Sequence, residues 1–191
     1  MKKTIPLIIC FSLFFNLLYG QLPGESPEQK KERMAWWTQD RFGMFIHWGL
    51  YALPARHEWV KRYERMTNEE YQKYFDLFNP DLYDPVSWAK MARKAGMKYA
   101  VITSKHHEGF CLFDSKYTAY KATNTPAGRD LLKEWVDAFR AEGLKVGFYY
   151  SVVNWRWHGF WDANAYAEEL PKIVDEIHNQ INELMTNYGK I

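Results

Sequence analysis

The feature that most constrains the fold is a repeated passage from helix to strand. A glycine, one apolar residue and a lysine precede a short apolar run at residues 99–104, and the same arrangement precedes residues 146–151, 47 positions further along. The two glycines, Gly96 and Gly143, stand where amphipathic segments end, which is typical of the residue just past a helix. Short apolar runs of this kind are typical of buried parallel strands. The repeat therefore predicts alternating helices and strands.

Three helices are expected to accompany these strands. Residues 85–95 and residues 131–142 each follow an aspartate, which is a favourable N-cap. Residues 164–187 place apolar side chains at helical spacing, and Gly189 follows them as the earlier glycines follow their helices. Helices alternating with strands form a parallel sheet whose faces are covered, with right-handed crossovers.

The expected fold class is α/β, a (β/α)₈-like TIM barrel of which this chain holds only the first three or so βα units. A complete barrel needs about 250 residues, and the fourth strand is expected to begin where the sequence reaches Ile191. We therefore expect residues 21–191 to be the N-terminal part of a barrel domain, truncated before the fourth strand.

The first twenty residues have the pattern of an export signal. Two lysines precede an apolar run, and the small Gly20 offers a cleavage point before Gln21. The run is short and interrupted, so stable insertion into a membrane is not expected. Residues 1–20 are predicted to be a signal peptide, with a retained anchor as the alternative. The protein is then secreted or periplasmic, or lysosomal if its source is eukaryotic.

Charge and cysteine content exclude some classes of partner and cross-link. Without residues 1–20 the chain has equal numbers of basic and acidic side chains, so nothing favours a nucleic acid or an anionic membrane surface. Cys111 is then the one remaining cysteine, which excludes a disulfide within the chain and is typical of a small buried hydrophobe. Aromatic residues make up 18% of the sequence, which fits a large aromatic core or a carbohydrate pocket equally well.

Polar side chains follow two of the predicted strands. His47 follows the apolar run that begins near Phe42, and His106 and His107 follow the run at 99–103. Parallel strands carry binding and catalytic residues at their carboxyl ends, so we expect these imidazoles to meet around one hollow, although histidines also serve as core groups. Adjacent strand residues point to opposite faces, and no zinc-type spacing is present, so no metal site is predicted.

Six motifs, taken in order, resemble those of one known family. They are RFGMFIHWG (41–49), YALPARHEW (51–59), YAVITSKHHEGF (99–110), DLLKEW (130–135), GFYYS (147–151) and NYGK (187–190). This series resembles the α-L-fucosidases of glycoside hydrolase family 29, and the resemblance covers roughly residues 31–191. Two positions depart from the family pattern. His57 stands where glycine is common, and Glu108 stands where aspartate is usual.

The resemblance implies a retaining exo-glycosidase that hydrolyses terminal α-L-fucose from glycans or glycoconjugates. The residues it assigns to substrate binding are His47, Glu58, Trp59, His106, His107 and Tyr150, with Tyr149 as the alternative if the inward parity of the strand is reversed. It places the nucleophile and the acid/base carboxylate beyond Ile191, so no catalytic residue is assigned and this chain alone is expected to be inactive. Trp155, Arg156 and Trp157 either form more of the rim or pack the loop.

Two other functions remain open from the sequence. One is a metal-dependent hydrolase on a similar barrel, and the other is a non-catalytic sugar-binding protein. No cofactor is implied for the fucosidase, whose expected partner is a fucosylated substrate.

Overall fold

The computed structural model describes residues 24–191 and divides the chain into two compact units, Met1–Arg41 and Phe42–Ile191. The predicted signal peptide, residues 1–20, lies outside the described residues.

The described part of the first unit contains one helix, α2 (Pro27–Gln39). The hydroxyl of Ser26 accepts a hydrogen bond from the Gln29 backbone, and the Gln29 side chain accepts one from the Ser26 N–H, which together form a capping box. Pro27 suits the first turn because the N–H it lacks would have no partner there. This helix was not predicted, because it buries none of its residues and so has no apolar stripe to recognise.

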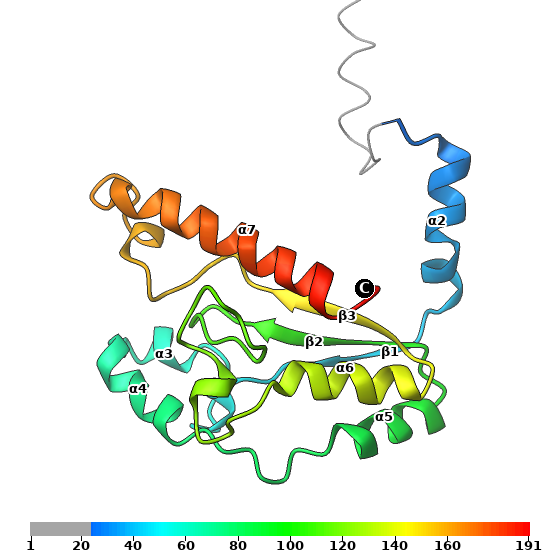
Figure 1. Cartoon of the computed structure of the whole chain (residues 1–191), viewed down its shortest axis with the longest axis horizontal. Helices are drawn as coiled ribbons and strands as arrows, with labels where there is room; N and C mark the ends of the chain where they lie inside the picture. The colour runs from blue at the N-terminus through cyan, green and yellow to red at the C-terminus, as the bar shows by residue number, and fades with distance from the viewer. Residues whose placement is uncertain (1–23) are drawn as a thin grey trace, which may run out of the picture. The chain divides into compact units, whose positions relative to one another are not determined.

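The second unit is built on a three-stranded parallel sheet, in the order β1-β2-β3 (Figure 1). The strands are β1 (Gly43–Ile46), β2 (Tyr99–Lys105) and β3 (Lys145–Tyr150). Ile102 in the middle strand pairs with Ile46 on one side and Phe148 on the other. The α/β class and the two strands of the repeat are therefore confirmed.

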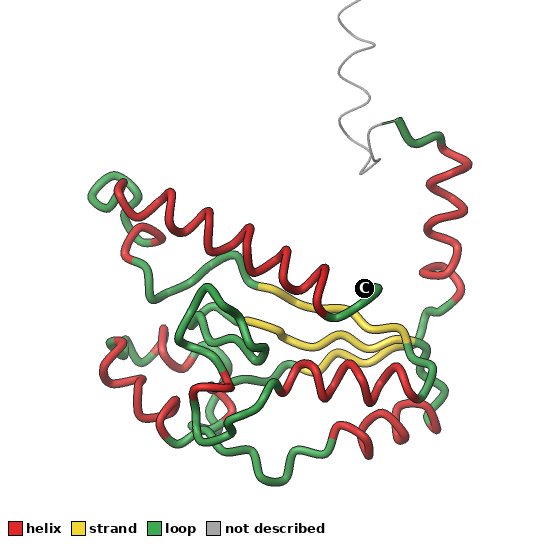
Figure 2. Tube along the Cα trace, viewed as in Figure 1, coloured by secondary structure: helices red, strands yellow, loops and turns green. Residues whose placement is uncertain are grey.

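Helices and loops alternate with the strands, and long loops lie at the end where β2 and β3 finish (Figure 2). The helices are α3 (Val60–Tyr63), α4 (Asn68–Asp76), α5 (Pro85–Lys94), α6 (Leu131–Ala141) and α7 (Leu170–Asn187). Four short 3₁₀ helices lie in the connections: η2 (Leu50–Ala52), η3 (Ala122–Asn124), η4 (His158–Phe160) and η5 (Ala167–Glu169).

Helices α5 and α6 begin and end as the sequence predicts. The Asp84 carboxylate accepts the backbone N–H of the third helical residue of α5, and the Asp130 carboxylate does the same for α6. Gly96 and Gly143 have φ angles of +86° and +71°, the left-handed conformation that a glycine past a helix adopts without strain.

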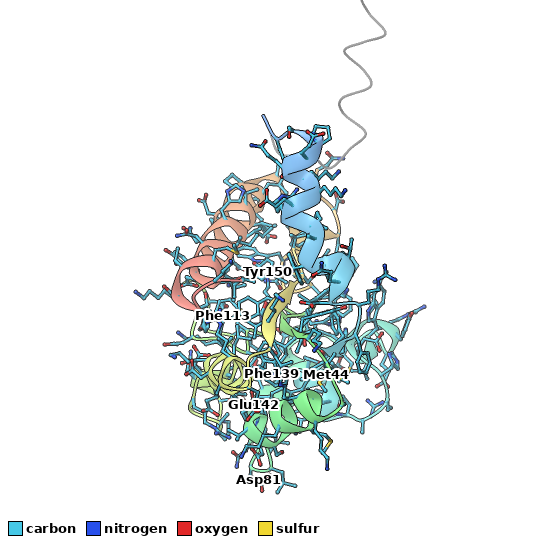
Figure 3. The ribbon with its side chains drawn as sticks, turned by 90° about the vertical axis from the view of Figure 1, so that its right-hand side faces the viewer. Met44, Asp81, Phe113, Phe139, Glu142 and Tyr150 are labelled. Carbon is cyan, nitrogen blue, oxygen red and sulfur yellow. The ribbon has the colours of Figure 1, made fainter. Side chains whose placement is uncertain are left out.

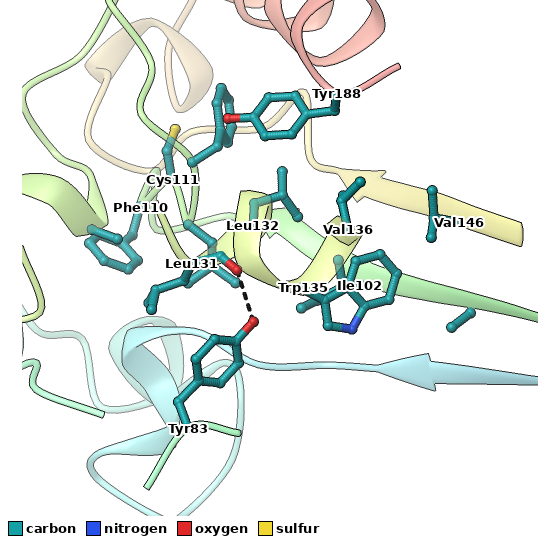
Figure 4. Close-up of a cluster of buried hydrophobic side chains, with 14 of the residues drawn as sticks. Tyr83, Ile102, Phe110, Cys111, Leu131, Leu132, Trp135, Val136, Val146 and Tyr188 are labelled. Atoms are coloured by element: carbon teal, nitrogen blue, oxygen red, sulfur yellow. Dashed lines mark hydrogen bonds between the residues drawn. The ribbon is translucent and has the colours of Figure 1, made fainter. Parts of the chain in front are cut away.

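The hydrophobic core lies between the sheet and helices α5 and α6. Leu132, Trp135 and Val136 of α6 pack over Ile102 and Val146 of the sheet (Figure 4). The hydroxyl of Tyr83 donates a hydrogen bond of 2.8 Å to the carbonyl of Leu131, which fixes the start of α6 against the loop before α5. Cys111 is fully buried, as expected for a small hydrophobe.

Helix α7 is shorter than predicted. Its expected start at residue 164 is wrong, because residues before Leu170 form turns and the 3₁₀ helix η5. Pro171 lies in the first turn of α7, where its missing N–H costs nothing, whereas the same residue inside a longer helix would break it. Gly189, with φ +73°, follows the helix as predicted.

The opposite face of the sheet carries a different set of side chains. Phe45 pairs with Val101, which pairs with Gly147, and Phe45 keeps 55% of its surface exposed. Within residues 24–191, no helix has both the length and the apolar character needed to cross a membrane.

Candidate functional site

The site lies at the carboxyl-terminal edge of the parallel sheet. His47 directly follows β1, and His106 directly follows β2. Two hydrogen bonds hold the strand ends together: the Trp48 N–H donates to Thr103 Oγ1 at 2.9 Å, and Thr103 Oγ1 donates to the Trp48 carbonyl at 2.6 Å. Because a threonine of β2 binds both backbone groups of Trp48, the residue after β1 is fixed in place beside the end of β2.

Three imidazole rings meet at this edge. The ring centroids of His47 and His106 are 4.8 Å apart, and those of His106 and His107 are 4.2 Å apart. Tyr51 packs edge-on against His106 at 4.8 Å, and Tyr149 lies 6.2 Å from both His47 and His106. The two adjacent histidines lie side by side because β2 has already ended at Lys105, so the alternation of a strand no longer applies.

A buried carboxylate fixes the orientation of His106. Its Nδ1 lies 3.0 Å from Glu108 Oε2, and both side chains are about 2% exposed. A carboxylate accepts hydrogen bonds, so Nδ1 carries the proton and donates it to Glu108. Gly49 leaves room for this pair, since a β-carbon there would lie 3.4 Å from Glu108 Oε1 and 2.9 Å from the Tyr51 ring. Aspartate is usual in the family at the position of Glu108, and the sequence did not predict that this carboxylate orients His106.

A serine fixes the tautomer of His107. Ser151 Oγ donates its one proton to the Val153 carbonyl at 3.0 Å, so in its 2.7 Å contact with His107 Nδ1 the hydroxyl accepts the imidazole proton. The other ring nitrogen, Nε2, then has a free lone pair. Burial, with the neighbouring His106 and His47, lowers the pKa of His107 to about 4. The ring is neutral near pH 7 and offers a hydrogen-bond acceptor.

His47 is the most exposed of the three imidazoles, and partial burial still lowers its pKa, with a smaller contribution from His106. It lines a hollow of about 320 Å³ together with Tyr51, Arg56, His57 and Glu58. Arg56 is paired with the Glu64 carboxylate. Glu58 is an exposed carboxylate that lines this hollow.

Trp59 forms an aromatic wall beside His107. Its ring stands perpendicular to that of His107 at 5.3 Å and packs edge-on against Trp155 at 5.6 Å. Trp155 in turn lies 5.2 Å from His107, and its N–H donates a 2.7 Å hydrogen bond to the His107 carbonyl. Among residues 155–157, Trp155 is the one whose ring lies beside both His107 and Trp59.

Tyr149 and Tyr150 lie on opposite sides of β3, and the structure places Tyr149, not Tyr150, beside the imidazoles. The hydroxyl of Tyr150 donates to Gln180 Oε1 of α7 at 2.7 Å and accepts from Lys105 Nζ at 3.2 Å. Figure 3 shows Tyr150 near the upper end of the yellow strand β3. The expected position of Tyr150 in the pocket is thus corrected in favour of the alternative. Tyr149 shares its face of β3 with Gly147, and Tyr150 shares the other face with Val146 and Phe148, as the alternation of a strand requires.

A charged network lies behind the imidazoles. Lys105 is 1% exposed, and its Nζ is 3.5 Å from Glu176 of α7. Glu176 also accepts hydrogen bonds from Asn154 Nδ2 at 2.9 Å and Trp157 Nε1 at 3.0 Å. Burial lowers the pKa of Lys105, and the nearby carboxylate opposes that change. The network joins β2, the loop after β3 and α7, and its one sign in the sequence is a lysine in an apolar strand.

Among residues 24–191, no group of three or more histidine, cysteine, aspartate or glutamate side chains is arranged to hold a metal ion. Sequence reasoning also missed Tyr51 and Ser151 as parts of the site. Ser151 had one available signal, since it repeats the position of Ser104 in the 47-residue repeat.

Comparison with known proteins assigns the family. The model of the α-L-fucosidase family matches residues 21–190. The chain belongs to the α-L-fucosidase family. Its relatives include plasma α-L-fucosidase of Homo sapiens, 33% identical over 81% of this chain and 37% of that protein, and α-L-fucosidase of Dictyostelium discoideum, 30% identical over 95% of this chain and 46% of that protein.

Solved structures of α-L-fucosidases agree with this assignment. Isoenzyme 1 from Paenibacillus thiaminolyticus matches with a TM-score of 0.78 and 57% identity, over 85% of this chain and 42% of that one. The Thermotoga maritima α-fucosidase, whose structure contains fucose, matches with a TM-score of 0.70 and 33% identity, over 80% of this chain and 44% of that one. This α-L-fucosidase homologue therefore spans less than half the length of each of these four relatives.

Proposed function

We propose that this chain supplies the fucose-binding half of a retaining α-L-fucosidase that releases terminal α-L-fucose from glycans or glycoconjugates. The observation that carries the proposal is the meeting of His47, His106 and His107 at the carboxyl edge of a parallel sheet. The family match supports the same reading, as does the fucose in the Thermotoga maritima structure.

The proposed sugar contacts follow from the state of each side chain. His107 Nε2 accepts a hydrogen bond from a ring hydroxyl, since its other nitrogen is bound to Ser151. His106 Nε2 does the same, since Glu108 holds its Nδ1 proton. Glu58 accepts from further hydroxyls, and Trp59 covers the apolar side of the sugar, including its methyl group.

We assign the carboxylates around the hollow to binding and support, not to bond cleavage. A retaining mechanism needs two carboxyl groups about 5–5.5 Å apart across the anomeric carbon. Glu108 is bound to His106 and has no room to attack, because it is buried. The nucleophile and the acid/base are accordingly proposed beyond Ile191, on further βα units that complete a (β/α)₈-like barrel. Residues 21–191 then form its N-terminal part.

Export of the protein is part of the proposal. The relatives include plasma and tissue α-L-fucosidases, and residues 1–20 have the composition of a signal peptide. N-terminal sequencing of the exported protein is expected to begin at Gln21.

Titration calorimetry with L-fucose tests the binding function. The unmodified chain is expected to bind L-fucose, and His47→Ala is expected to weaken binding about tenfold, the loss of one hydrogen bond worth about 1.4 kcal/mol. His47 is exposed, so this change leaves folding intact. The control is His178→Ala, an exposed histidine on α7. No binding of L-fucose, or equal loss in both variants, would contradict the proposal.

Hydrolysis of an aryl α-L-fucoside is a separate test of the placement of the carboxylates. No turnover is expected from the 191-residue chain. Turnover would keep the fucosidase function but show that the nucleophile lies within residues 1–191.

A further inference from the structure

A second pocket lies beside Trp155, whose ring also contacts His107. It has a volume of about 540 Å³ and lies between helices α3 and α4 and the loop after β3. Figure 1 shows α3 and α4 at the end toward which the arrows of β2 and β3 point, the same end that carries the imidazoles. Trp155 belongs to both places, since it contacts His107 and also lines this pocket, which we call the outer pocket.

A row of aromatic side chains leads from His107 into the outer pocket. His107 lies 5.2 Å from Trp155, and the Trp155 ring is stacked on Trp161 at 6.4 Å. The guanidinium of Arg62 lies over the Trp161 ring at 4.5 Å. Flat apolar rings of this kind bind the C–H faces of sugars. The row therefore provides a surface on which a chain of sugars can extend from a fucose held at His107.

The outer pocket carries an excess of positive charge. Lys61, Arg62 and Arg65 line it, with Glu69 as its one lining carboxylate. Lys61 is already bound to Asn68 Oδ1 at 3.0 Å. Arg62 and Arg65 are exposed, and in the described part of the chain neither has a carboxylate within ion-pair distance. Two guanidinium groups thus remain available to an anion.

The geometry of both arginines suits an oxyanion. The guanidinium of Arg62 lies over the Trp161 ring, and its N–H groups can bind a carboxylate or a sulfate with two parallel hydrogen bonds. Arg65 has φ +54°, a left-handed conformation that is costly for a residue with a side chain. The turn that imposes this conformation places Arg65 on the outer pocket.

We propose that the outer pocket binds the part of the glycan to which fucose is attached, and that Arg62 and Arg65 select a sugar bearing a carboxylate or a sulfate ester. This inference rests on the proposed function for the fucose subsite. It adds a substrate class, namely acidic fucosylated glycans, that neither the imidazoles nor Trp59 determine.

The test compares three fucosyl disaccharides by calorimetry. The second sugar is N-acetylglucosamine, N-acetylglucosamine 6-sulfate or glucuronic acid, so that the last two arms separate sulfate from carboxylate as the preferred group. At low salt at least one acidic disaccharide is expected to bind about tenfold more tightly than the neutral one, and the preference is expected to shrink at 0.5 M salt because exposed charges are screened.

Variants show whether the two arginines cause the preference. The double change Arg62→Ala with Arg65→Ala is expected to abolish it, and the control Arg93→Ala, an exposed arginine on α5, is expected to keep it. Equal affinities for all three disaccharides would overturn the inference, as would a preference that survives the double change.

Two free sugars separate failure of this inference from failure of the proposed function. L-fucose tests the fucose subsite, and glucuronic acid tests the outer pocket. If L-fucose does not bind, the fucose subsite is wrong. The indole resonance of Trp161 then decides the outer pocket separately. A shift on addition of glucuronic acid or N-acetylglucosamine 6-sulfate supports it, and no shift with either overturns it.

Discussion

The two tyrosines at the end of β3 lead to two regions that differ in almost every physical respect. On the Tyr149 side lie three imidazoles that range from exposed at His47 to buried at His106, and His107 is neutral near pH 7 with a free acceptor nitrogen. On the Tyr150 side lies a buried network in which Lys105, Glu176 and Gln180 bind one another or Tyr150. One strand end thus builds a region with acceptor nitrogens open to a ligand and, behind it, a buried region in which Lys105, Glu176 and Tyr150 bind protein partners.

The difference teaches what each region contributes. Buried ionic groups lose stability when a partner is removed, because the remaining charge is left without solvent. Half-exposed groups lose little stability but can exchange water for a ligand. Changes on the Tyr150 side should therefore affect unfolding, and changes on the Tyr149 side should affect sugar binding.

The largest effect is expected from Lys105→Met. The change leaves Glu176 with its hydrogen bonds from Asn154 and Trp157 but without its cation, and we expect the free energy of unfolding to fall by on the order of 3 kcal/mol. Urea unfolding measures it. Lys133→Met is the control, because Lys133 forms an exposed pair with Asp137 whose loss costs about 0.5 kcal/mol or less. Equal losses in the two variants would remove the distinction between the regions.

The next prediction compares the effects of removing each tyrosine hydroxyl. Tyr150→Phe removes the donor to Gln180 Oε1, so the free energy of unfolding should fall by about 1–3 kcal/mol. Tyr149→Phe should leave stability within about 0.5 kcal/mol and weaken L-fucose binding about tenfold. Urea unfolding and calorimetry on both variants provide the measurements. The reverse pattern would show that Tyr150, not Tyr149, lies in the pocket.

A smaller effect is expected at Glu108, which positions His106. Glu108→Ala removes the acceptor for Nδ1, so the imidazole loses its fixed tautomer and L-fucose affinity should fall several-fold. Glu108→Gln should restore most of the affinity, since its amide oxygen still accepts the same proton. The nitrogen chemical shifts of His106 report the tautomer directly. An unchanged shift in the alanine variant would show that Glu108 does not orient the ring.

The smallest effect is a dependence on pH. With a pKa of about 4, His107 is expected to bind L-fucose without change from pH 7 to about 5 and to lose affinity as it takes up a proton near pH 4. The unfolded chain takes up that proton near pH 6.5. The contribution of His107 to stability is therefore complete above that value and declines as the pH falls toward 4. A proton NMR titration of His107 with a midpoint near 6.5 would contradict this.

How far the sequence predicts the molecule differs between its parts. Helices α5 and α6 were found because an aspartate cap, an apolar stripe and a glycine agree at each. The predicted start of α7 is six residues too early, because the apolar spacing does not show where the helix begins. Pro171 does mark the first turn. His47, His106 and His107 were found from their place after apolar strands.

Contacts between distant residues were beyond the same reasoning. The hydroxyl of Tyr150 binds Gln180 and Lys105, which lie 30 and 45 residues away in the sequence. The bond between Ser151 and His107 joins residues 44 apart, and the outer pocket joins α3, α4 and the loop after β3. No local pattern in any one of these segments predicts such contacts.

Gly109, which follows His106, His107 and Glu108, packs closely against Asn154 of the buried network. It has φ +85°, and a β-carbon at this position would overlap the amide of Asn154, whose Nδ2 binds Glu176. A larger residue at position 109 would therefore push Asn154 away from Glu176 and disturb the attachment of α7. Because Gly109 has no side chain, the segment that carries His106 and His107 packs closely enough against Asn154 for a change in this segment to alter the position of α7.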